Sequence, residues 1–116
     1  MTTKRIVVGA HYGLKDWLVQ RVTAVVLAAY TVILLLTLPA QPELTYGSWA
    51  GLFASPWMKV FTLLALLSLM WHAWIGVRDI YMDYIKPTGV RLFLQILTVL
   101  ALVGYGCWTV IILWRV

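Results

Sequence analysis

His72 is the residue whose type and position point most directly to chemistry. It is the single histidine in the apolar stretch SLMWHAWIGV, which begins at Ser68. An ionisable side chain at membrane depth is costly, so it requires a partner and often marks a functional site. The residues alone leave two interpretations open. One is a hydrogen bond to a neighbouring helix, and the other is axial ligation of a b-type haem iron, for which imidazole is a usual ligand. A structural zinc site is disfavoured, because no set of cysteine, histidine and carboxylate ligands lies at that depth.

The same segment ends in charged and aromatic residues. Asp79 and Asp83 are spaced i,i+4, and Tyr81 and Tyr84 are spaced i,i+3, so each pair shares a helix face. Tyrosine is common at the edge of a membrane, where it anchors a helix. A phenol beside a carboxylate can also hydrogen-bond a quinone carbonyl and assist proton delivery. Both interpretations of this helix end stay open on the residues alone.

Helical spacing places His72 on a narrow stripe. At about 100° per residue, several small side chains and the two carboxylates fall within roughly 40° of the histidine. These residues are Ala65, Ser68, Gly76, Asp79 and Asp83. Small side chains leave room for another helix or for a flat ligand. We therefore expect the stripe to face protein or a cofactor rather than lipid.

The elements that position these residues are predicted from the apolar runs. The chain is 63% hydrophobic and 11% charged, and a soluble domain of this size could not bury so much apolar surface. Three runs without charge are close to the roughly 20 residues that cross a bilayer core of about 30 Å. They predict an all-α membrane protein with one membrane-anchor domain over residues 1–116 and three transmembrane helices, at about 21–38, 57–82 and 88–114.

The basic residues are distributed unevenly around these runs. Seven precede the first run or surround the connection between the second and third: Lys4, Arg5, Lys15, Arg21, Arg78, Lys86 and Arg91. Only Lys59 and Arg115 lie at the opposite helix ends. This asymmetry predicts a cytoplasmic N-terminus and a periplasmic C-terminus. It also accounts for the net charge of +5 without a nucleic-acid-binding patch.

Two further features narrow the location and the chemistry. The N-terminal residues resemble neither a cleaved signal peptide nor an Arg- and Ser-rich mitochondrial leader, which favours a multi-pass protein of the bacterial inner membrane. Cys107 is the single cysteine. The chain by itself therefore cannot form a disulfide, an iron–sulfur cluster or a covalent CxxCH haem attachment.

Several short motifs together resemble a known family. They are D-x-x-x-x-R at 16–21, E-L-T-Y at 43–46, K-V-F-T-L-L-A-L at 59–66, H-A-W-I-G at 72–76, and D-Y-I-K-P at 83–87 followed by Arg91. In this order and with three spans, they resemble the hydrophobic membrane-anchor subunit of succinate dehydrogenase, respiratory complex II. The resemblance covers the chain except for its first ten residues.

The resemblance implies a role within a larger enzyme. In that family the anchor pairs with a second, cytochrome b-type membrane subunit, and the two share a haem b and form the ubiquinone site. A flavoprotein with FAD and an iron–sulfur subunit dock on the cytoplasmic side, and relatives suggest a trimer of heterotetramers. The resemblance assigns His72 as an axial ligand of the haem iron and Tyr84 as a quinone contact, with Asp83 supporting that site. It places Arg21 near the haem propionates, whereas the residue type alone favours a snorkelling anchor at the membrane surface.

The sequence accordingly predicts a subunit of succinate dehydrogenase with no catalytic residue, flavin site or dicarboxylate site of its own. Electrons from succinate would reach ubiquinone beside this chain. Two alternatives remain. One is the anchor of a fumarate reductase, which works in reverse with menaquinol. The other is a structural or assembly protein of the membrane, without redox function, in which His72 is only hydrogen-bonded.

Overall fold

The computed structural model describes the backbone of residues 9–116 and the side chains of residues 13–116. Four helices follow one another: α1 (Gly9–Thr37), α2 (Tyr46–Ala54), α3 (Pro56–Tyr84) and α4 (Thr88–Trp114). α1 from Gly13, α3 and α4 are each long and apolar enough to cross a membrane. The prediction of an all-α chain with three such helices is confirmed. The assignment of its two ends to cytoplasm and periplasm stays a prediction.

The first helix begins at Gly9, well before the predicted start at 21. The apolar run marks only the part of a helix that lipid surrounds. Residues 9–20 contain no proline, and extending an existing helix costs far less than nucleating a new one. At 1.5 Å per residue, α1 is about 43 Å long and exceeds a bilayer core of about 30 Å. Its first turns therefore extend beyond the hydrocarbon region.

The connection between the first two spans contains a helix that the sequence analysis did not predict. α2 begins with a reciprocal capping box, in which Thr45 Oγ1 accepts from Ser48 N at 3.2 Å and Ser48 Oγ accepts from Thr45 N at 2.9 Å. Such a box satisfies two backbone donors at a helix start. Trp49 and Phe53 then stack edge to face, with ring centroids 4.9 Å apart. The helix is thus fixed by local contacts within a short segment that has few charges.

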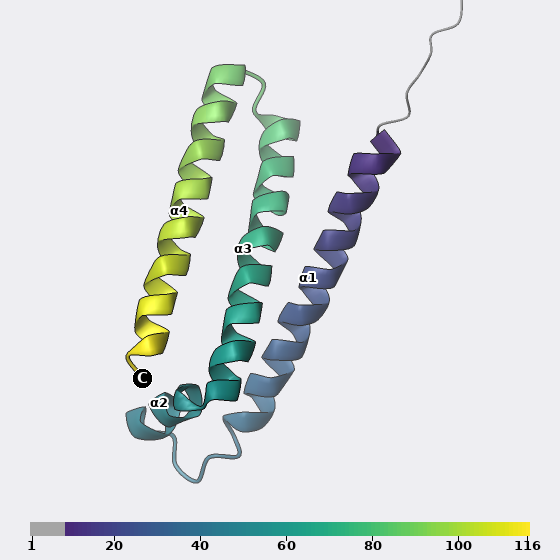
Figure 1. Ribbon diagram of the computed structural model, residues 1–116. Helices are drawn as coiled ribbons and strands as arrows, with labels where there is room; N and C mark the ends of the chain where they lie inside the picture. The colour runs from purple at the N-terminus through teal and green to yellow at the C-terminus, as the bar shows by residue number, and fades with distance from the viewer. Residues whose placement is uncertain (1–8) are drawn as a thin grey trace, which may run out of the picture.

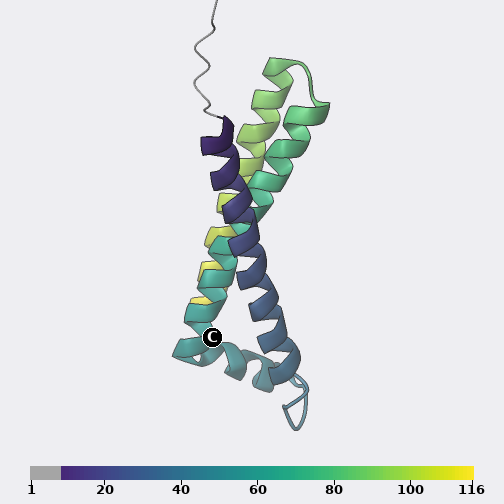
Figure 2. The same cartoon turned by 90° about the vertical axis from the view of Figure 1, so that its right-hand side faces the viewer.

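The three long helices form a single layer with α3 in the middle (Figure 1). Among the described helices, α3 packs along α1 on one side and along α4 on the other. Viewed along the layer, α1 crosses α3 at an angle (Figure 2). The start of α1 and the α3–α4 connection lie at one end of the layer, whereas α2 and the end of α4 lie at the other (Figure 1). α2 packs against α3 at that second end.

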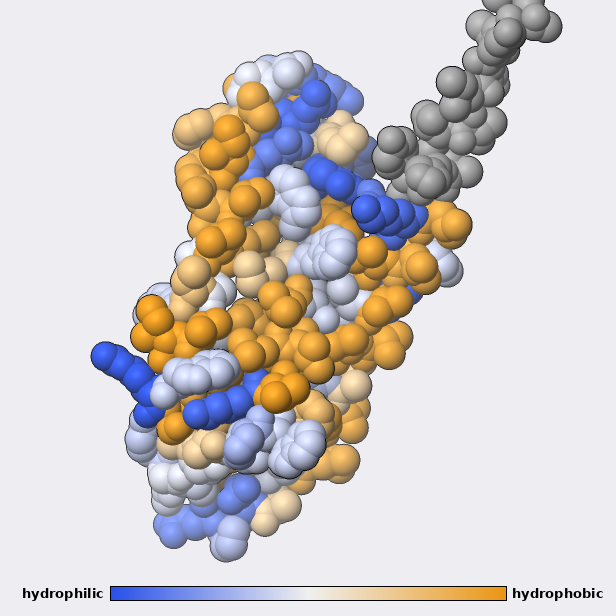
Figure 3. All heavy atoms as spheres, in the orientation of Figure 1, coloured by the Kyte–Doolittle hydropathy of each residue, from blue (hydrophilic) through white to orange (hydrophobic). Residues whose placement is uncertain are grey.

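A single layer has almost no interior. Among the described residues, the buried apolar side chains are Met58, Ala65, Ile75 and Leu113. On the face shown in Figure 3, hydrophobic residues cover much of the middle and the strongly hydrophilic residues lie towards the two ends. Both broad faces of the layer must therefore be covered by lipid or by helices of other subunits.

One close contact between α3 and α4 depends on a glycine. Gly106 is buried, and a Cβ atom at this position would lie 2.7 Å from Met70 Sδ. No real Cβ contact is that short, so the glycine lets the thioether pack directly against the α4 backbone. Small residues have this use throughout membrane helix interfaces, where close packing replaces the hydrophobic driving force.

A hydrogen bond across α1 and α3 gives a test of this packing. The Tyr30 hydroxyl lies 2.6 Å from Thr62 Oγ1. In a double-mutant cycle with Tyr30→Phe and Thr62→Val, we expect a coupling free energy of about 0.6 kcal/mol, because bonds between membrane helices average that value. The measurement is the free energy of unfolding in bicelles. A control cycle with Tyr30→Phe and Thr31→Val should give no coupling, because among the described residues Thr31 Oγ1 bonds the Leu27 carbonyl of its own helix and not Tyr30. Equal coupling in both cycles would contradict the assignment.

Candidate functional site

Three polar residues of α1 face α3 in the half of the layer that contains the α3–α4 connection. Asp16, Gln20 and Thr23 lie within an arc of roughly 60° on α1. Each contacts α3: Asp16 pairs with Arg78, and Gln20 and Thr23 both bond His72. The two helices are therefore joined here by polar contacts, and His72 lies at their inner end.

The His72 ring is held by the Thr23 hydroxyl. Thr23 is 6% exposed, and its Oγ1 lies 3.0 Å from His72 Nδ1. The same oxygen lies 2.7 Å from the Val19 carbonyl oxygen. It also lies 3.2 Å from the Gln20 carbonyl oxygen, so its single proton has acceptors within its own helix. With that proton donated to a carbonyl, Thr23 Oγ1 accepts from His72, and we assign the imidazole proton to Nδ1 on this ground.

This tautomer leaves the other ring nitrogen with a lone pair. In neutral imidazole one nitrogen carries the proton and the other is an acceptor or a metal ligand. His72 Nε2 makes no hydrogen bond to any residue whose side chain is described. The first interpretation of His72, a hydrogen bond to a neighbouring helix, is therefore observed at Nδ1. The second interpretation, ligation through Nε2, is chemically available and stays a prediction.

Gln20 fixes the backbone beside the same histidine. Its Nε2 donates to the His72 carbonyl oxygen at 3.3 Å. A Cβ atom at Gly76, one turn further along α3, would lie 3.7 Å from that amide nitrogen. Gln20 Oε1 is buried and has no partner among the described residues. The Gln20 amide is thus held at its nitrogen, and its oxygen remains available as a hydrogen-bond acceptor.

Arg78 closes the polar interface near the membrane surface. One guanidinium nitrogen pairs with Asp16 of α1 and lies 3.5 Å from Asp79 of α3. The Arg78 side chain is 27% exposed, and its Nε is buried without a partner among the described residues. The charge of Arg78 is therefore used to hold α1 to α3, in addition to any positive-inside effect.

The predicted stripe on α3 faces α1 over part of its length. Ala65 is buried, and His72 and Gly76 approach Thr23 and Gln20. For these residues the prediction that the stripe faces protein is confirmed. Asp79 and Asp83 lie further along and are exposed.

Two tyrosines at the end of α3, which looked alike in the sequence, have different environments in the structure. Tyr81 OH lies 2.9 Å from Thr98 Oγ1 and so joins α3 to α4. Tyr84 is 77% exposed and makes no hydrogen bond to a described residue, and Asp83 beside it is also exposed. His72 and Tyr84 are 12 residues apart, which is about 18 Å along the helix axis. This chain therefore presents two separate positions rather than one pocket.

Arg21 lies away from these contacts. It is exposed, and its guanidinium carbon is 5.5 Å from the centroid of the Trp17 ring. On the helix, Arg21 is turned by roughly 160° from Thr23. A cation stacked on tryptophan at this depth fits an interfacial anchor. The predicted contact of Arg21 with haem propionates is a separate hypothesis and stays a prediction.

Sequence reasoning missed Gln20 and Thr23. The signal was available, because Asp16, Gln20, Thr23 and Tyr30 recur at helical spacing. It was hidden by the assumption that the helix began at 21, which left two of the four outside it.

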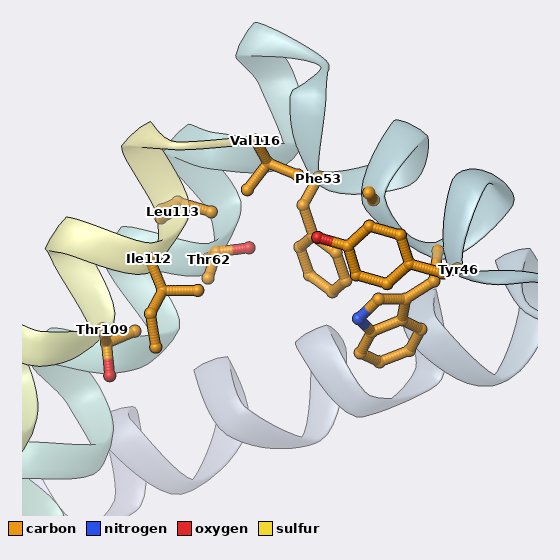
Figure 4. A pocket seen from close by; sticks show the side chains of 9 residues that line it. Tyr46, Phe53, Thr62, Thr109, Ile112, Leu113 and Val116 are labelled. Atoms are coloured by element: carbon orange, nitrogen blue, oxygen red, sulfur yellow. The ribbon is translucent and has the colours of Figure 1, made fainter.

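A hollow lies at the opposite end of the layer. It has a volume of about 240 Å³ and lies between α2, α3 and α4. Tyr46, Trp49 and Phe53 of α2 line it on one side, and Ile112 and Leu113 of α4 line it on the other (Figure 4). Its walls are mainly apolar, and their polar side chains are the hydroxyls of Tyr46, Thr62 and Thr109 and the Trp49 indole. None of the predicted site residues lines it.

Comparison with known proteins gives one family. A sequence model of the succinate dehydrogenase/fumarate reductase transmembrane subunit matches residues 1–107. The chain is also 42% identical, over 102 residues, to a protein of Coxiella burnetii (strain RSA 493 / Nine Mile phase I) named succinate dehydrogenase hydrophobic membrane anchor subunit. That match covers 88% of this chain and 89% of the relative.

The ion pair between Asp16 and Arg78 can be tested by Asp16→Asn. The Asp16 side chain is 40% exposed, so solvent screening limits the loss in unfolding free energy to about 1 kcal/mol or less. The loss should shrink at high salt. Asp79→Asn is the matched control, because Asp79 is 59% exposed and lies 3.5 Å from the same guanidinium. Equal losses from the two substitutions, measured by unfolding in bicelles, would argue against a specific α1–α3 pair.

Proposed function

The chain belongs to the succinate dehydrogenase/fumarate reductase transmembrane subunit family, and on that premise we propose that it is the membrane anchor of a succinate:ubiquinone oxidoreductase. In this proposal a partner flavoprotein oxidises succinate at FAD. A partner iron–sulfur subunit passes the electrons to the membrane. The chain itself supplies one haem ligand, part of a ubiquinone site and the surface on which the two soluble subunits dock.

The observation that carries the proposal is the state of the His72 ring. Nδ1 lies 3.0 Å from Thr23 Oγ1, whose own proton has an acceptor at the Val19 carbonyl, and with the imidazole proton on Nδ1 the other nitrogen, Nε2, keeps its lone pair. A histidine that ligates a metal ordinarily has its second nitrogen hydrogen-bonded in this way, which fixes the ring and the tautomer. The residue thus fits an axial ligand of haem b. Haem bound there supplies a one-electron carrier inside the bilayer.

A second membrane subunit is required to complete this site. A haem with two axial histidines needs a second imidazole. Among the described side chains of residues 13–116 His72 is the one histidine, and His11 lies outside them. In the described part of the chain, the single layer leaves many large apolar side chains of its helices exposed. A cytochrome b-type subunit packed on one face would bring the second axial ligand and cover the apolar surface.

Tyr84 and Asp83 are proposed to form this chain's part of the quinone site. The Tyr84 phenol is exposed at the end of α3 and is not used in packing, so it can donate a hydrogen bond to a quinone carbonyl oxygen. Reducing a quinone to a quinol takes up two electrons and two protons. The exposed Asp83 carboxylate beside the phenol can pass protons from the aqueous side.

The proposed orientation follows from where the charges lie. Arg78, Lys86 and Arg91 surround the α3–α4 connection, at the same end of the layer as the start of α1. Lys59 and Arg115 lie near the start of α3 and the end of α4, at the other end. The positive-inside rule then puts the Tyr84 end in the cytoplasm and the α2 end in the periplasm of a bacterium. A trimer of heterotetramers is the assembly that we expect from the resemblance.

The family description includes fumarate reductase, so that direction is the second candidate. The name of the Coxiella relative favours succinate dehydrogenase. Purification of the complex from membranes separates three hypotheses: a succinate dehydrogenase anchor, a fumarate reductase anchor and a structural membrane protein. Flavin, iron–sulfur and haem that co-purify support either redox enzyme, and the native quinone distinguishes the two. Purification of the chain without these groups would instead support a structural membrane protein.

His72→Ala tests the haem assignment. Removing the imidazole should abolish the reduced-minus-oxidised bands of a haem with two protein ligands, measured on the purified complex. Ser68→Ala, one turn away on the same stripe, is the control and should leave the spectrum unchanged. An unaltered spectrum in the His72 variant would exclude ligation.

Tyr84→Phe tests the quinone assignment. Loss of one hydrogen bond to the substrate should lower quinone reductase activity about tenfold. Succinate oxidation with an artificial acceptor at the flavin should be unchanged. Tyr46→Phe, an exposed tyrosine at the other end of the layer, should affect neither rate. Equal loss of both activities in the Tyr84 variant would indicate an assembly defect instead.

A further inference from the structure

We propose that Thr23 is a positioning residue for the haem ligand. Its hydroxyl holds His72 in the tautomer whose Nε2 can bind iron, and it sets the electron-donating strength of that nitrogen. The inference rests on the proposed function, because it acts through His72. It adds a residue from a different helix, 49 positions away in the sequence, to the control of the haem.

The position of Thr23 favours an acceptor role for its hydroxyl oxygen. Threonines in these helices commonly bond a carbonyl one turn earlier, as Thr31 bonds Leu27 and Thr109 bonds Tyr105, both at 2.8 Å. Thr23 makes the same bond to Val19 at 2.7 Å, but it is also buried against α3 and meets His72. Its proton has acceptors in its own helix, the Val19 and Gln20 carbonyl oxygens at 2.7 and 3.2 Å, and donation there decides its role toward His72. Only its lone pairs are then left for the imidazole.

Removing the hydroxyl would change the ligand in two ways. The Nδ1 proton would lose its acceptor in a dry interface, so the tautomer with the proton on Nε2, which cannot ligate, would gain population. The ligating nitrogen would also become less basic, because an acceptor at Nδ1–H increases the basicity of the imidazole. A weaker donor stabilises ferric iron less, and the haem midpoint potential should rise.

The experiment uses the whole complex purified from membranes. Thr23→Val removes the hydroxyl at nearly constant volume, and Thr23→Ser retains it. Thr31→Val is the matched control, since it removes the same intrahelical bond from the same helix without touching His72. The readouts are the haem midpoint potential from a redox titration and haem retention on dilution. Succinate oxidation at the flavin reports assembly.

The expected result is a rise in midpoint potential and a roughly 10–100-fold loss of haem affinity in Thr23→Val. Thr23→Ser and Thr31→Val should match the unaltered complex. If Thr23→Val does not assemble, Thr23→Cys replaces it, because a thiol is only a weak acceptor. The potential should then rise in the Cys variant and stay constant in the Ser variant.

Two failures are distinguishable. The positioning role of Thr23 would be overturned if Thr23→Val, or its Cys replacement, had the same haem potential and haem retention as Thr31→Val. In that case the His72→Ala result would still support ligation. Haem bands that survive His72→Ala would overturn the proposed ligand itself.

Discussion

The structure depends on satisfying polar groups between two helices where no water is available. Lipid is as apolar as the side chains, so it gives no hydrophobic drive for helix association, and packing with interhelical hydrogen bonds must supply the stability. Between α1 and α3 these bonds run from Asp16–Arg78 near the surface, through His72, to Tyr30–Thr62 deeper in the layer. The bond from Thr23 both holds α1 to α3 and contacts the Nδ1 nitrogen of His72.

The spans were predictable from the sequence because lipid imposes a simple constraint on length and polarity. The ends of the helices near the membrane surface were harder to predict from the sequence, because they depend on local hydrogen bonding that hydropathy does not report. α1 extends back from the apolar run to Gly9 because nothing between them breaks the helix. α2 begins at a capping box that uses Ser48 in place of the usual glutamate or glutamine. Each difference follows from backbone hydrogen bonding rather than from hydrophobicity.

Among the candidate site residues, some were predictable from the sequence and others were not. His72 was identifiable because a histidine inside an apolar run is costly, and the roles proposed for Asp83 and Tyr84 come from the motif that they share with a family. The partners of His72 were not identifiable, because they require the relative rotation and depth of two helices. Tyr81 and Tyr84 show the limit clearly, since only the packing of α3 against α4 reveals that the first is bonded to Thr98.

The single-layer fold is consistent with the proposal that this chain would supply only part of a haem site and part of a quinone site. A layer with few buried side chains cannot enclose a haem or a quinone, yet it can present ligands on a rigid helix. α3 is suited to this because α1 and α4 fix it from both sides, while its faces stay open. If a partner subunit brings the second ligand, the haem itself joins the two subunits, and cofactor binding contributes to assembly by mass action. In that arrangement the tautomer of one histidine affects both electron transfer and the stability of the membrane domain.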